Sequence, residues 1–255
     1  MLNSLVREEG AGEAPYPSLR YILSGGAPIS PALVRRIMET FGTEYVQTYG
    51  LTETSPYLTV SLLDERQRLL PEQERFRLAS RTGRPFEGVE LKVVGENGRE
   101  IEPDDREVGE ILARGPTITP GYWNRPEETA AAFTNGWLRT GDLAVIDTAG
   151  FLNIVDRKKD VIITGGENVY STEVENALHE HRSVREVAVI GVPDDHWGER
   201  VKAVVALTQG ATPDEAALIE FCRERLAGFK IPRTVEFVHD LPKTATGKIR
   251  KRSLR

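Results

Sequence analysis

The chain has 255 residues, of which 39% are hydrophobic and 28% are charged, values close to ordinary globular usage. Its 33 basic and 39 acidic side chains give a formal net charge of −6, which argues against a main role in binding nucleic acid. This composition excludes global disorder, and the length fits one large or two small domains.

The first part of the chain shows a strand, a helix and a second strand. A short strand is predicted at 20–23, and it leads into the loop Ser24–Pro28. The following helix is predicted to begin after Ser30 as N-cap and to end at Gly42. A second strand is predicted at 44–48, and strand, helix and strand in this order are typical of a parallel sheet.

The middle of the chain is predicted to form hairpins. One hairpin joins 89–94 to 108–114, and another joins 143–147 to 151–155 through a glycine-containing turn. Such closely spaced strands indicate a small antiparallel barrel or sheet. The charged stretch 61–80 shows no apolar periodicity and is predicted to be a surface excursion.

The last part of the chain, 157–255, has enough elements for a small α+β domain of its own. The predicted strands and helix are 161–164, 172–181 (the helix), 186–192, 201–208 and 235–238. A further helix has a complete start signal, with Thr212 as N-cap, Pro213 at the first position and Glu215 closing a capping box. Its apolar face would contain Ala216, Ile219, Cys222 and Leu226.

Cysteine usage and hydropathy favour a cytoplasmic protein. The single cysteine, Cys222, cannot form an intramolecular disulfide, which fits a reducing compartment. The start of the chain, MLNSLVREE, does not have the form of a basic leader, and we expect no membrane span because every apolar run is too short. His179, His181 and one cysteine do not make a metal site.

Four loops rich in glycine and hydroxyl groups follow predicted strands or turns: Ser24–Pro28, Thr48–Ser55, Thr140–Asp142 and Thr244–Lys248. Exposed backbone N–H groups and hydroxyls in such loops are typical of phosphate sites. The last loop is not a P-loop, because Ile249 stands where Ser or Thr is needed. No GxGxxG segment follows a strand, so a dinucleotide fold is unsupported.

Seven segments lie in order along the chain: SGGAP (24–28), YGLTETSP (49–56), GEILARGPTITPGYWNRPEET (109–129), GWLRTGDLAVID (136–147), DRKKDVIITGGENVYSTEVE (156–175), GVPDDHWGERV (191–201) and LPKTATGKIRK (241–251). Together they resemble the acyl-CoA synthetases of the adenylate-forming superfamily. The resemblance implies an α/β and α+β fold. Residues 1–156 would be the carboxyl-terminal part of the large adenylating domain, with a partial parallel sheet and a small antiparallel β-barrel. Residues 157–255 would be a small mobile α+β lid domain.

Such enzymes join a carboxylate to the α-phosphate of ATP and then transfer the acyl group to coenzyme A. The resemblance implies that Tyr49 stacks on adenine beside the backbone of Gly25, Gly26 and Ala27. Gly50, the residue after Tyr49, would belong to the same nucleotide site. The other interpretation of Tyr49 is a buried residue at the end of a strand.

The resemblance also implies contacts to the rest of the nucleotide. Thr52 and Glu53 would serve the phosphates, with Glu53 helping to hold Mg²⁺. Asp142 would accept hydrogen bonds from both ribose hydroxyls, and Arg157 would add a positive contact nearby. Without the resemblance, Asp142 is equally a turn residue and Arg157 a surface residue in a charged run.

Catalysis and domain movement are implied for residues further along the chain. Lys248 would bridge the substrate carboxylate and the α-phosphate in the first step. Lys159 would be the hinge of the lid, and Gly165 and Gly166 would leave room for the pantetheine arm of CoA. The alternative for Lys248 is a solvated basic tail, and the alternative for Gly165 and Gly166 is a plain strand turn. Ser171 stands where members often carry proline.

A phosphate-binding loop that members carry in their upstream half, rich in Ser, Thr and Gly and ending in Pro-Lys-Gly, does not precede Tyr21. We therefore expect the chain to be a fragment whose amino-terminal half comes from the same gene or another chain. It should have little ligase turnover alone, and the strands near 20 and 45 should expose apolar faces. Tyr57 and Leu58 contact the acyl group or belong to the core.

The function predicted is an AMP-forming acid–CoA ligase, with a fatty acid favoured as the substrate. Its partners would be a small carboxylic acid, ATP (leaving AMP), Mg²⁺ and CoA, without nucleic acid. One alternative is an aryl-acid CoA ligase or an adenylating enzyme that loads a carrier protein. Another is an inactive remnant that binds a nucleotide or a partner.

Overall fold

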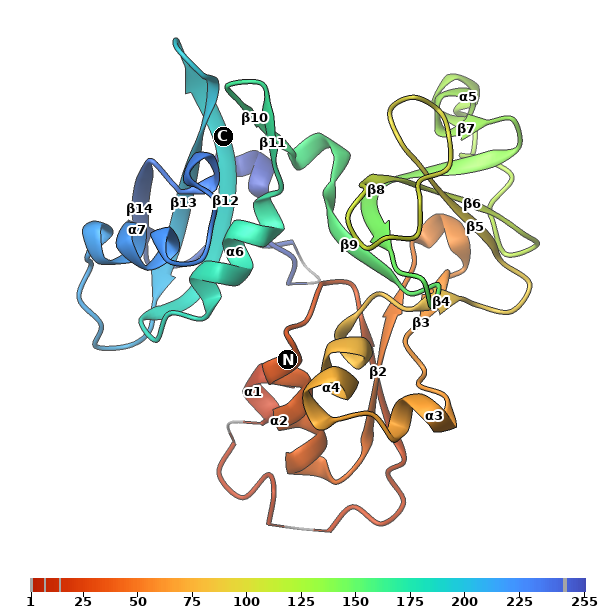
Figure 1. Cartoon of the computed structure of the whole chain (residues 1–255), viewed down its shortest axis with the longest axis horizontal. Helices are drawn as coiled ribbons and strands as arrows, with labels where there is room; N and C mark the ends of the chain where they lie inside the picture. The colour runs from red at the N-terminus through yellow and green to blue at the C-terminus, as the bar shows by residue number, and fades with distance from the viewer. Residues whose placement is uncertain (1, 7, 14, 245–246) are drawn as a thin grey trace. The chain divides into compact units, whose positions relative to one another are not determined.

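A computed structural model describes residues 2–6, 8–13, 15–244 and 247–255. The chain divides into two compact units, Met1–Ile154 and Val155–Arg255 (Figure 1). Each unit has hydrophobic clusters of its own. Among the described residues, no helix has the length and hydropathy needed to cross a bilayer.

The first unit begins with a four-stranded sheet in the order β1-β2-β3-β4. The β1/β2 pair is parallel, as predicted, and the other two pairs are antiparallel. The elements of this part are α1 (Leu2–Leu5), β1 (Tyr21–Gly25), α2 (Pro31–Phe41), β2 (Glu44–Tyr49), a 3₁₀ turn at Thr52–Thr54, β3 (Thr59–Val60), α3 (Glu65–Arg68), α4 (Glu72–Ser80) and β4 (Arg84–Pro85).

The start and end of α2 follow the predicted signals. The Ser30 hydroxyl accepts a hydrogen bond from the Leu33 N–H at 3.3 Å, and Pro31 opens the helix. Gly42 adopts φ +59°, the left-handed conformation common after a helix. Val34 and Ile37 are fully buried in the cluster that α2 shares with β2 and α4.

The prediction of a surface excursion at 61–80 is wrong. This stretch forms α3 and α4, and Phe76, Leu78 and Ala79 of α4 are buried against α2. Most other residues of α4 are charged or polar, so its apolar side chains are too few to show a helical period. The packing against α2, which the local pattern does not contain, buries them.

The two strands expected to expose apolar faces differ. β1 lies at the edge of the sheet, and its Tyr21 and Leu23 are 41% and 56% exposed, as expected. β2 is covered, with Tyr45 and Val46 3% and 5% exposed. The expectation is wrong for β2, because β3 pairs with it at Thr48 and Tyr49 and because Tyr45 packs in the cluster shared with α2 and α4.

A five-stranded sheet follows in the order β5-β6-β8-β7, with β9 beside β8. Both predicted hairpins are confirmed, since β5 pairs with β6 and β9 pairs with β8. The structure carries the sheet and half-barrel expected of the fold class. Its elements are β5 (Glu90–Val94), β6 (Gly109–Arg114), α5 (Pro126–Ala132), β7 (Phe133–Thr134), β8 (Trp137–Ile146) and β9 (Leu152–Arg157).

The second unit is a five-stranded sheet in the order β11-β10-β13-β12, with β14 parallel to β13. Helices α6 and α7 cover one face of this sheet (Figure 1). The elements are a 3₁₀ turn at Lys158–Asp160, β10 (Ile162–Thr164), β11 (Glu167–Val169), α6 (Ser171–His179), β12 (Val184–Asp194), β13 (Gly198–Leu207), α7 (Glu215–Arg223), a 3₁₀ turn at Gly228–Lys230, β14 (Thr234–Val238) and a 3₁₀ turn at Lys251–Ser253.

The last residues of the chain pack against the other face of this sheet. Leu241, Ile249 and Leu254 contact Ala188 of β12 and Val204 of β13. Side chains alternate between the faces of a strand, and the neighbours of these two residues point into the cluster shared with α6 and α7. The basic tail is therefore part of the folded unit.

The start of α7 differs from its prediction. Asp214, instead of Thr212, is the N-cap, and its carboxylate accepts a hydrogen bond from the Ala217 N–H at 2.9 Å. Glu215 closes no capping box, because its carboxylate accepts from the Val235 N–H at 2.7 Å. Leu218, which the predicted face omitted, is buried.

Candidate functional site

Two predicted site residues from distant parts of the first unit are in contact. The Tyr49 hydroxyl, at the end of β2, donates to Asp142 Oδ2 of β8 at 2.7 Å. Asp142 is only 6% exposed, and the Tyr49 ring packs against two apolar clusters of the five-stranded sheet. This hydrogen bond therefore connects the four-stranded sheet to the five-stranded sheet.

Residues next to Asp142 set its orientation. Gly141 has φ +72°, a conformation that favours glycine. The Thr140 hydroxyl accepts from the Asp142 N–H at 3.1 Å and donates to the Ile111 carbonyl at 2.8 Å. The Asp142 side chain thus projects from an irregular position within the long strand β8, where the register with β6 shifts.

The loop after β1 lies beside the end of β2. Gly25 pairs with Thr48 in the parallel register, and a Cβ on Gly25 would lie 2.5 Å from the Thr48 hydroxyl oxygen. The Gln47 side chain donates to the Ala27 carbonyl at 2.8 Å, and Gly26 adopts φ +84°. Gly25, Gly26 and Ala27 are exposed, so their backbone is accessible at the strand ends, where parallel sheets commonly bind ligands.

The loop after Tyr49 is held tightly. A Cβ on Gly50 would lie 1.7 Å from the Pro56 carbonyl oxygen, so no larger residue fits. Thr54 is buried, accepts from the Leu51 N–H at 2.9 Å and donates within the same turn. This packing leaves Thr52 exposed.

Glu53 is held by a residue that the sequence analysis did not single out. The Tyr122 hydroxyl donates to Glu53 Oε1 at 2.8 Å, and the Thr119 N–H donates to the Glu53 carbonyl at 2.8 Å. The hydrogen bond to Glu53 raises the pKa of Tyr122. The only sequence signal was the place of both partners within the segment 109–129.

The donor set around Glu53 fits a magnesium ion shared with a phosphate ligand. Among the described residues there is no group of three or more His, Cys, Asp or Glu side chains that could hold a metal. Mg²⁺ is commonly bound through one or two carboxylates together with substrate phosphates. A single half-buried carboxylate beside an exposed hydroxyl is compatible with that mode.

Lys248 lies in the second unit with an exposed side chain. Its N–H donates to the Thr244 hydroxyl at 3.1 Å, and its carbonyl accepts from the Thr244 N–H at 2.8 Å. Lys243 and Ile249 form a bridge across this turn. Ala245 and Thr246, in the middle of the predicted loop, lie outside the described residues.

Gly165 and Gly166 form the turn between β10 and β11, with φ +60° and +85°. Positive φ at both central residues is typical of a tight hairpin. The Gly165 N–H donates to the Trp197 carbonyl at 2.8 Å, and a Cβ on Gly165 would lie 2.8 Å from the Trp197 ring. The turn is therefore a tight hairpin packed against an indole ring.

Arg157 and Lys159 lie at the beginning of the second unit. The Arg157 N–H donates to the side chain of Asp156 at 2.7 Å, and its own side chain is exposed. Lys159 is in the 3₁₀ turn, with an exposed side chain and a carbonyl that accepts from Arg255 at 3.3 Å. Tyr57 is 41% exposed, whereas Leu58 is fully buried and belongs to the core.

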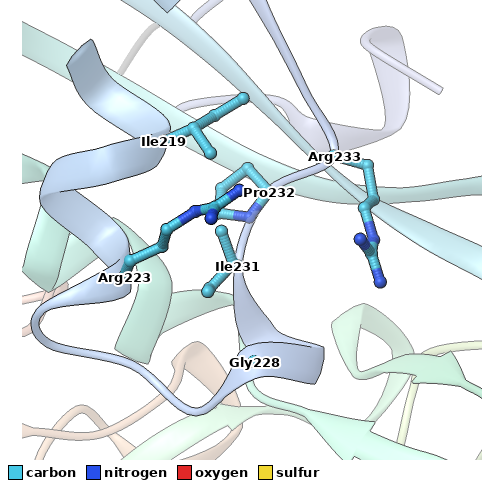
Figure 2. Close-up of a pocket in the computed structure, with 6 residues that line it drawn as sticks. All are labelled: Ile219, Arg223, Gly228, Ile231, Pro232 and Arg233. Carbon is cyan, nitrogen blue, oxygen red and sulfur yellow. The ribbon is translucent and has the colours of Figure 1, made fainter. Parts of the chain in front are cut away.

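Surface hollows lie on the described part of the second unit, and the residues that line the two described next include no predicted site residue. In one, with a volume of about 390 Å³, Arg223 and Arg233 flank apolar side chains (Figure 2). Its lining residues are Ile219, Arg223, Gly228, Ile231, Pro232 and Arg233. The other is lined by Val192, Arg200, Lys202, Glu215, Thr234, Val235 and Glu236.

Comparison with family models gives two matches in order along the chain. Residues 1–123 match the model described as AMP-binding enzyme, and residues 173–248 match the AMP-binding enzyme C-terminal domain. The two models therefore cover parts of both structural units.

Curated relatives align along nearly the whole chain. The 2-succinylbenzoate–CoA ligase of Geobacillus kaustophilus is 43% identical, over 100% of this chain and 49% of the ligase. A long-chain-fatty-acid–CoA ligase of Bacillus subtilis is 41% identical, over 93% of this chain and 40% of the ligase. The chain thus spans about half the length of the curated relatives it matches.

Solved structures also match nearly the whole chain. The amide bond synthetase McbA from Marinactinospora thermotolerans has a TM-score of 0.86 at 36% identity, covering 99% of this chain and 50% of McbA. The o-succinylbenzoate CoA synthetase of Bacillus subtilis, in complex with its acyl-adenylate intermediate, has a TM-score of 0.84 at 36% identity, covering 100% of this chain and 49% of the synthetase.

Proposed function

Because the chain belongs to the AMP-binding enzyme family, we propose that it contributes to an AMP-forming acid–CoA ligase. The observation that carries this proposal is the contact between Tyr49 and Asp142 beside the exposed Gly25–Ala27 backbone. It presents an aromatic ring and a carboxylate together, which are the groups needed to stack a base and to accept from ribose hydroxyls.

The proposed nucleotide contacts follow from this arrangement. The adenine stacks on Tyr49 and lies next to the backbone of Gly25, Gly26 and Ala27. Gly50, the residue after Tyr49, belongs to the same nucleotide site. Asp142 accepts from the ribose hydroxyls in addition to its hydrogen bond from Tyr49, and Arg157 adds a positive charge to the same sugar. A carboxylate has about four lone-pair sites, enough for several donors at once.

Thr52 and Glu53 serve the phosphates in this proposal. The exposed Thr52 hydroxyl donates to a phosphate oxygen, and Glu53 helps to hold Mg²⁺. When bound, the ion neutralises phosphate charge. Tyr122 orients Glu53 by donating to one carboxylate oxygen, and the other oxygen would help to hold Mg²⁺.

Lys248 acts in the first chemical step. A carboxylate oxygen of the substrate attacks the α-phosphorus of ATP, a new O–P bond forms, and the bond to pyrophosphate breaks. The Lys248 ammonium lies between the two anions and offsets the charge that builds on the transferring phosphoryl group. Thr244 anchors the backbone of this loop at Lys248, so the long Lys248 side chain spans the distance to the two anions.

The second step uses the residues around Lys159. Rotation at Lys159 replaces Lys248 by the Gly165–Gly166 turn, beside which the pantetheine arm of CoA passes. The CoA sulfur attacks the acyl carbon, the thioester bond forms, and AMP leaves. We place this chemistry in the cytoplasm, a proposal that the lone Cys222 supports.

The substrate is proposed as a fatty or aryl acid. The motif resemblance favours a fatty acid, and the Bacillus subtilis long-chain ligase agrees with it. The Geobacillus relative and the succinylbenzoate synthetase structure favour an aryl acid as the alternative.

Nucleotide binding tests the site directly. We expect the chain to bind AMP in calorimetry and Asp142→Asn to weaken this binding by about tenfold, because a charged acceptor is lost. The exposed Asp195→Asn variant serves as a control and should bind like the wild type. Equal affinities for wild type and Asp142→Asn would contradict the assigned ribose contact.

Ligase turnover tests the activity. The chain is assayed for ATP–pyrophosphate exchange with acids of both classes, alone and mixed with the portion of the Geobacillus ligase that it does not match. We expect exchange with at least one acid in the mixture, and thioester once CoA is added. AMP binding without exchange in any mixture would favour the alternative of a nucleotide-binding module.

A further inference from the structure

A series of polar contacts runs through the interior of the second unit. Asp156 is 4% exposed, and its Oδ2 accepts from both the N–H and the hydroxyl of Ser171, the latter at 2.8 Å. The Lys251 ammonium donates to the Ser171 hydroxyl oxygen and pairs with Glu175 Oε1 at 2.7 Å. Ser171 is fully buried, so its hydroxyl connects a carboxylate on one side to an ammonium on the other.

Both charged ends of this series are deep for their residue types. The side chains of Lys251 and Glu175 are 17% and 16% exposed, whereas lysine and glutamate are rarely buried unless paired. Glu175 Oε1 also accepts from the Val189 N–H of β12 at 2.8 Å. Burial raises the pKa of Glu175, while Lys251 opposes that shift. The ammonium is therefore fixed by α6 and, through Glu175, by the edge strand β12.

The two ends of the series have a functional position. Lys251 follows Lys248 by three residues, and Asp156 precedes Lys159 by three residues. A second set of contacts connects the same two segments. Arg255 donates to the Lys159 carbonyl at 3.3 Å and to Asp160 at 3.4 Å. The end of the chain is thus bonded to the turn that contains Lys159.

We propose that Ser171 and Lys251 are positioning residues that tie the Lys248 segment to the backbone preceding Lys159. This inference rests on the proposed function for the roles of Lys248 and Lys159. Because Asp156 precedes Lys159 while Ser171 and Lys251 follow it, the tie spans the hinge. It holds Lys248 in one position relative to the backbone before Lys159, and rotation at Lys159 has to break the contact between Asp156 and Ser171. A proline at 171 would supply neither the N–H nor the hydroxyl that Asp156 accepts.

Four variants test the tie. Lys251→Met removes the ammonium, and the Glu175 carboxyl, whose pKa burial raises, can take up a proton when its partner is lost, so the unit should still fold. Ser171→Ala removes only the central hydroxyl. Lys251→Arg keeps the charge. Lys202→Met is the matched control, because Lys202 pairs with Glu236 in the same unit.

Amide hydrogen exchange of the chain gives the first readout. In the wild type, the N–H groups of Gly247 and Arg250 donate to Thr244 and Pro242 at 2.9 and 2.8 Å. We expect Lys251→Met to accelerate exchange at 247–250 by about tenfold, and Ser171→Ala by a smaller factor. Exchange in β12 and β13 should not change, and Lys251→Arg should restore most of the protection at 247–250.

Two results for Lys251→Met would overturn the tie. One is unchanged exchange at 247–250 in Lys251→Met. The other is equal acceleration across β12, β13 and 247–250, which means that Lys251 only stabilises the unit as a whole. Lys202→Met should leave 247–250 as in the wild type, and a change there equal to that of Lys251→Met would also contradict the proposal.

Acyl-adenylate formation in the mixture described above gives the second readout. We expect Lys251→Met to lower kcat for pyrophosphate exchange by about tenfold or more with little change in the KM for ATP, because the nucleotide contacts lie elsewhere. Absence of exchange in every variant and in the wild type would reject the proposed function, while the amide exchange data would still decide whether the tie exists.

Discussion

The hydrogen bond between Tyr49 and Asp142 joins a half-buried hydroxyl to a buried carboxylate. A tyrosine hydroxyl that donates to a carboxylate contributes more than a neutral pair does. Asp142 is almost fully buried, so loss of a donor leaves a charged group less well solvated.

Tyr49→Phe should therefore destabilise the first unit by about 1.5 kcal/mol, the lower end of the usual range for a hydrogen bond to a charged group. The ring and its packing stay in place. Urea denaturation followed by fluorescence measures the change, and Tyr57→Phe at an exposed position should be close to neutral. Equal midpoints for the wild type and Tyr49→Phe would show that the bond adds nothing to stability.

Cys222 gives a pH-dependent prediction. The thiol is buried between α6, α7 and the sheet, and burial raises its pKa from 9.0 to about 11. Because the folded pKa lies above the unfolded value, the protonated thiol favours the folded state below pH 9, and this contribution is lost as the pH rises through about 11.

We therefore expect native Cys222 to react slowly with iodoacetamide at pH 8 to 9, about a hundredfold slower than in urea. Mass spectrometry of the alkylated chain measures the rate. Rapid labelling of the native chain at these pH values would contradict the burial of the thiol.

Helix α2 and helix α4 show what local sequence could and could not predict. Ser30, Pro31 and Gly42 mark the ends of α2 by local rules, and both ends are where these rules place them. In α4 the buried side chains of Phe76, Leu78 and Ala79 depend on contact with α2. A pattern read along one segment does not contain that contact.

Phe76→Ala should consequently destabilise the first unit by about 3 kcal/mol or more, as expected for a large side chain removed from a core. Leu69→Ala is the control, because Leu69 is 86% exposed in the same region. Thermal denaturation of both variants compares them. Similar melting temperatures would mean that 61–80 is the surface excursion after all.

The start of α7 provides a second comparison between two candidate caps. Asp214→Ala should cost about 1 kcal/mol of stability in the second unit, whereas Thr212→Ala should cost little. Chemical denaturation separates the two variants. A larger effect of Thr212→Ala would restore the cap predicted from the sequence.

The candidate site divides in the same way as the helices. Tyr49, Asp142 and the loop Gly25–Ala27 were predicted by motif, and the structure brings them together across two sheets. Tyr122 was not singled out, because a tyrosine 69 residues away from Glu53 carries no local mark of its contact. The motifs identify groups that touch ligands more readily than the residues that hold those groups.

At the scale of the whole molecule, the second unit has the features of an independent domain. Its main cluster contains Ile162, Val189, Leu218 and Cys222, together with other residues of the same unit. Its final segment covers the second face of its sheet. The predicted boundary after residue 156 and the division after Ile154 differ by two positions.

We expect residues 155–255 expressed alone to fold with one cooperative unfolding transition, since both faces of the sheet are covered from within. Circular dichroism during thermal unfolding, with dispersed amide signals in NMR, measures this. A shorter version ending at residue 240 is the comparison and should unfold at a lower temperature. A non-cooperative transition in 155–255 would contradict the autonomy of the unit.

The bond between Tyr49 and Asp142 also has a consequence for the thermodynamics of association. A side chain whose torsions are restrained before a ligand arrives loses less conformational entropy when the complex forms, a saving of about 0.5–1.5 kcal/mol for each such side chain. In calorimetry, a flat aromatic ligand should then bind the wild type with a smaller entropic penalty than it binds Tyr49→Phe, even where the stacking enthalpies are alike.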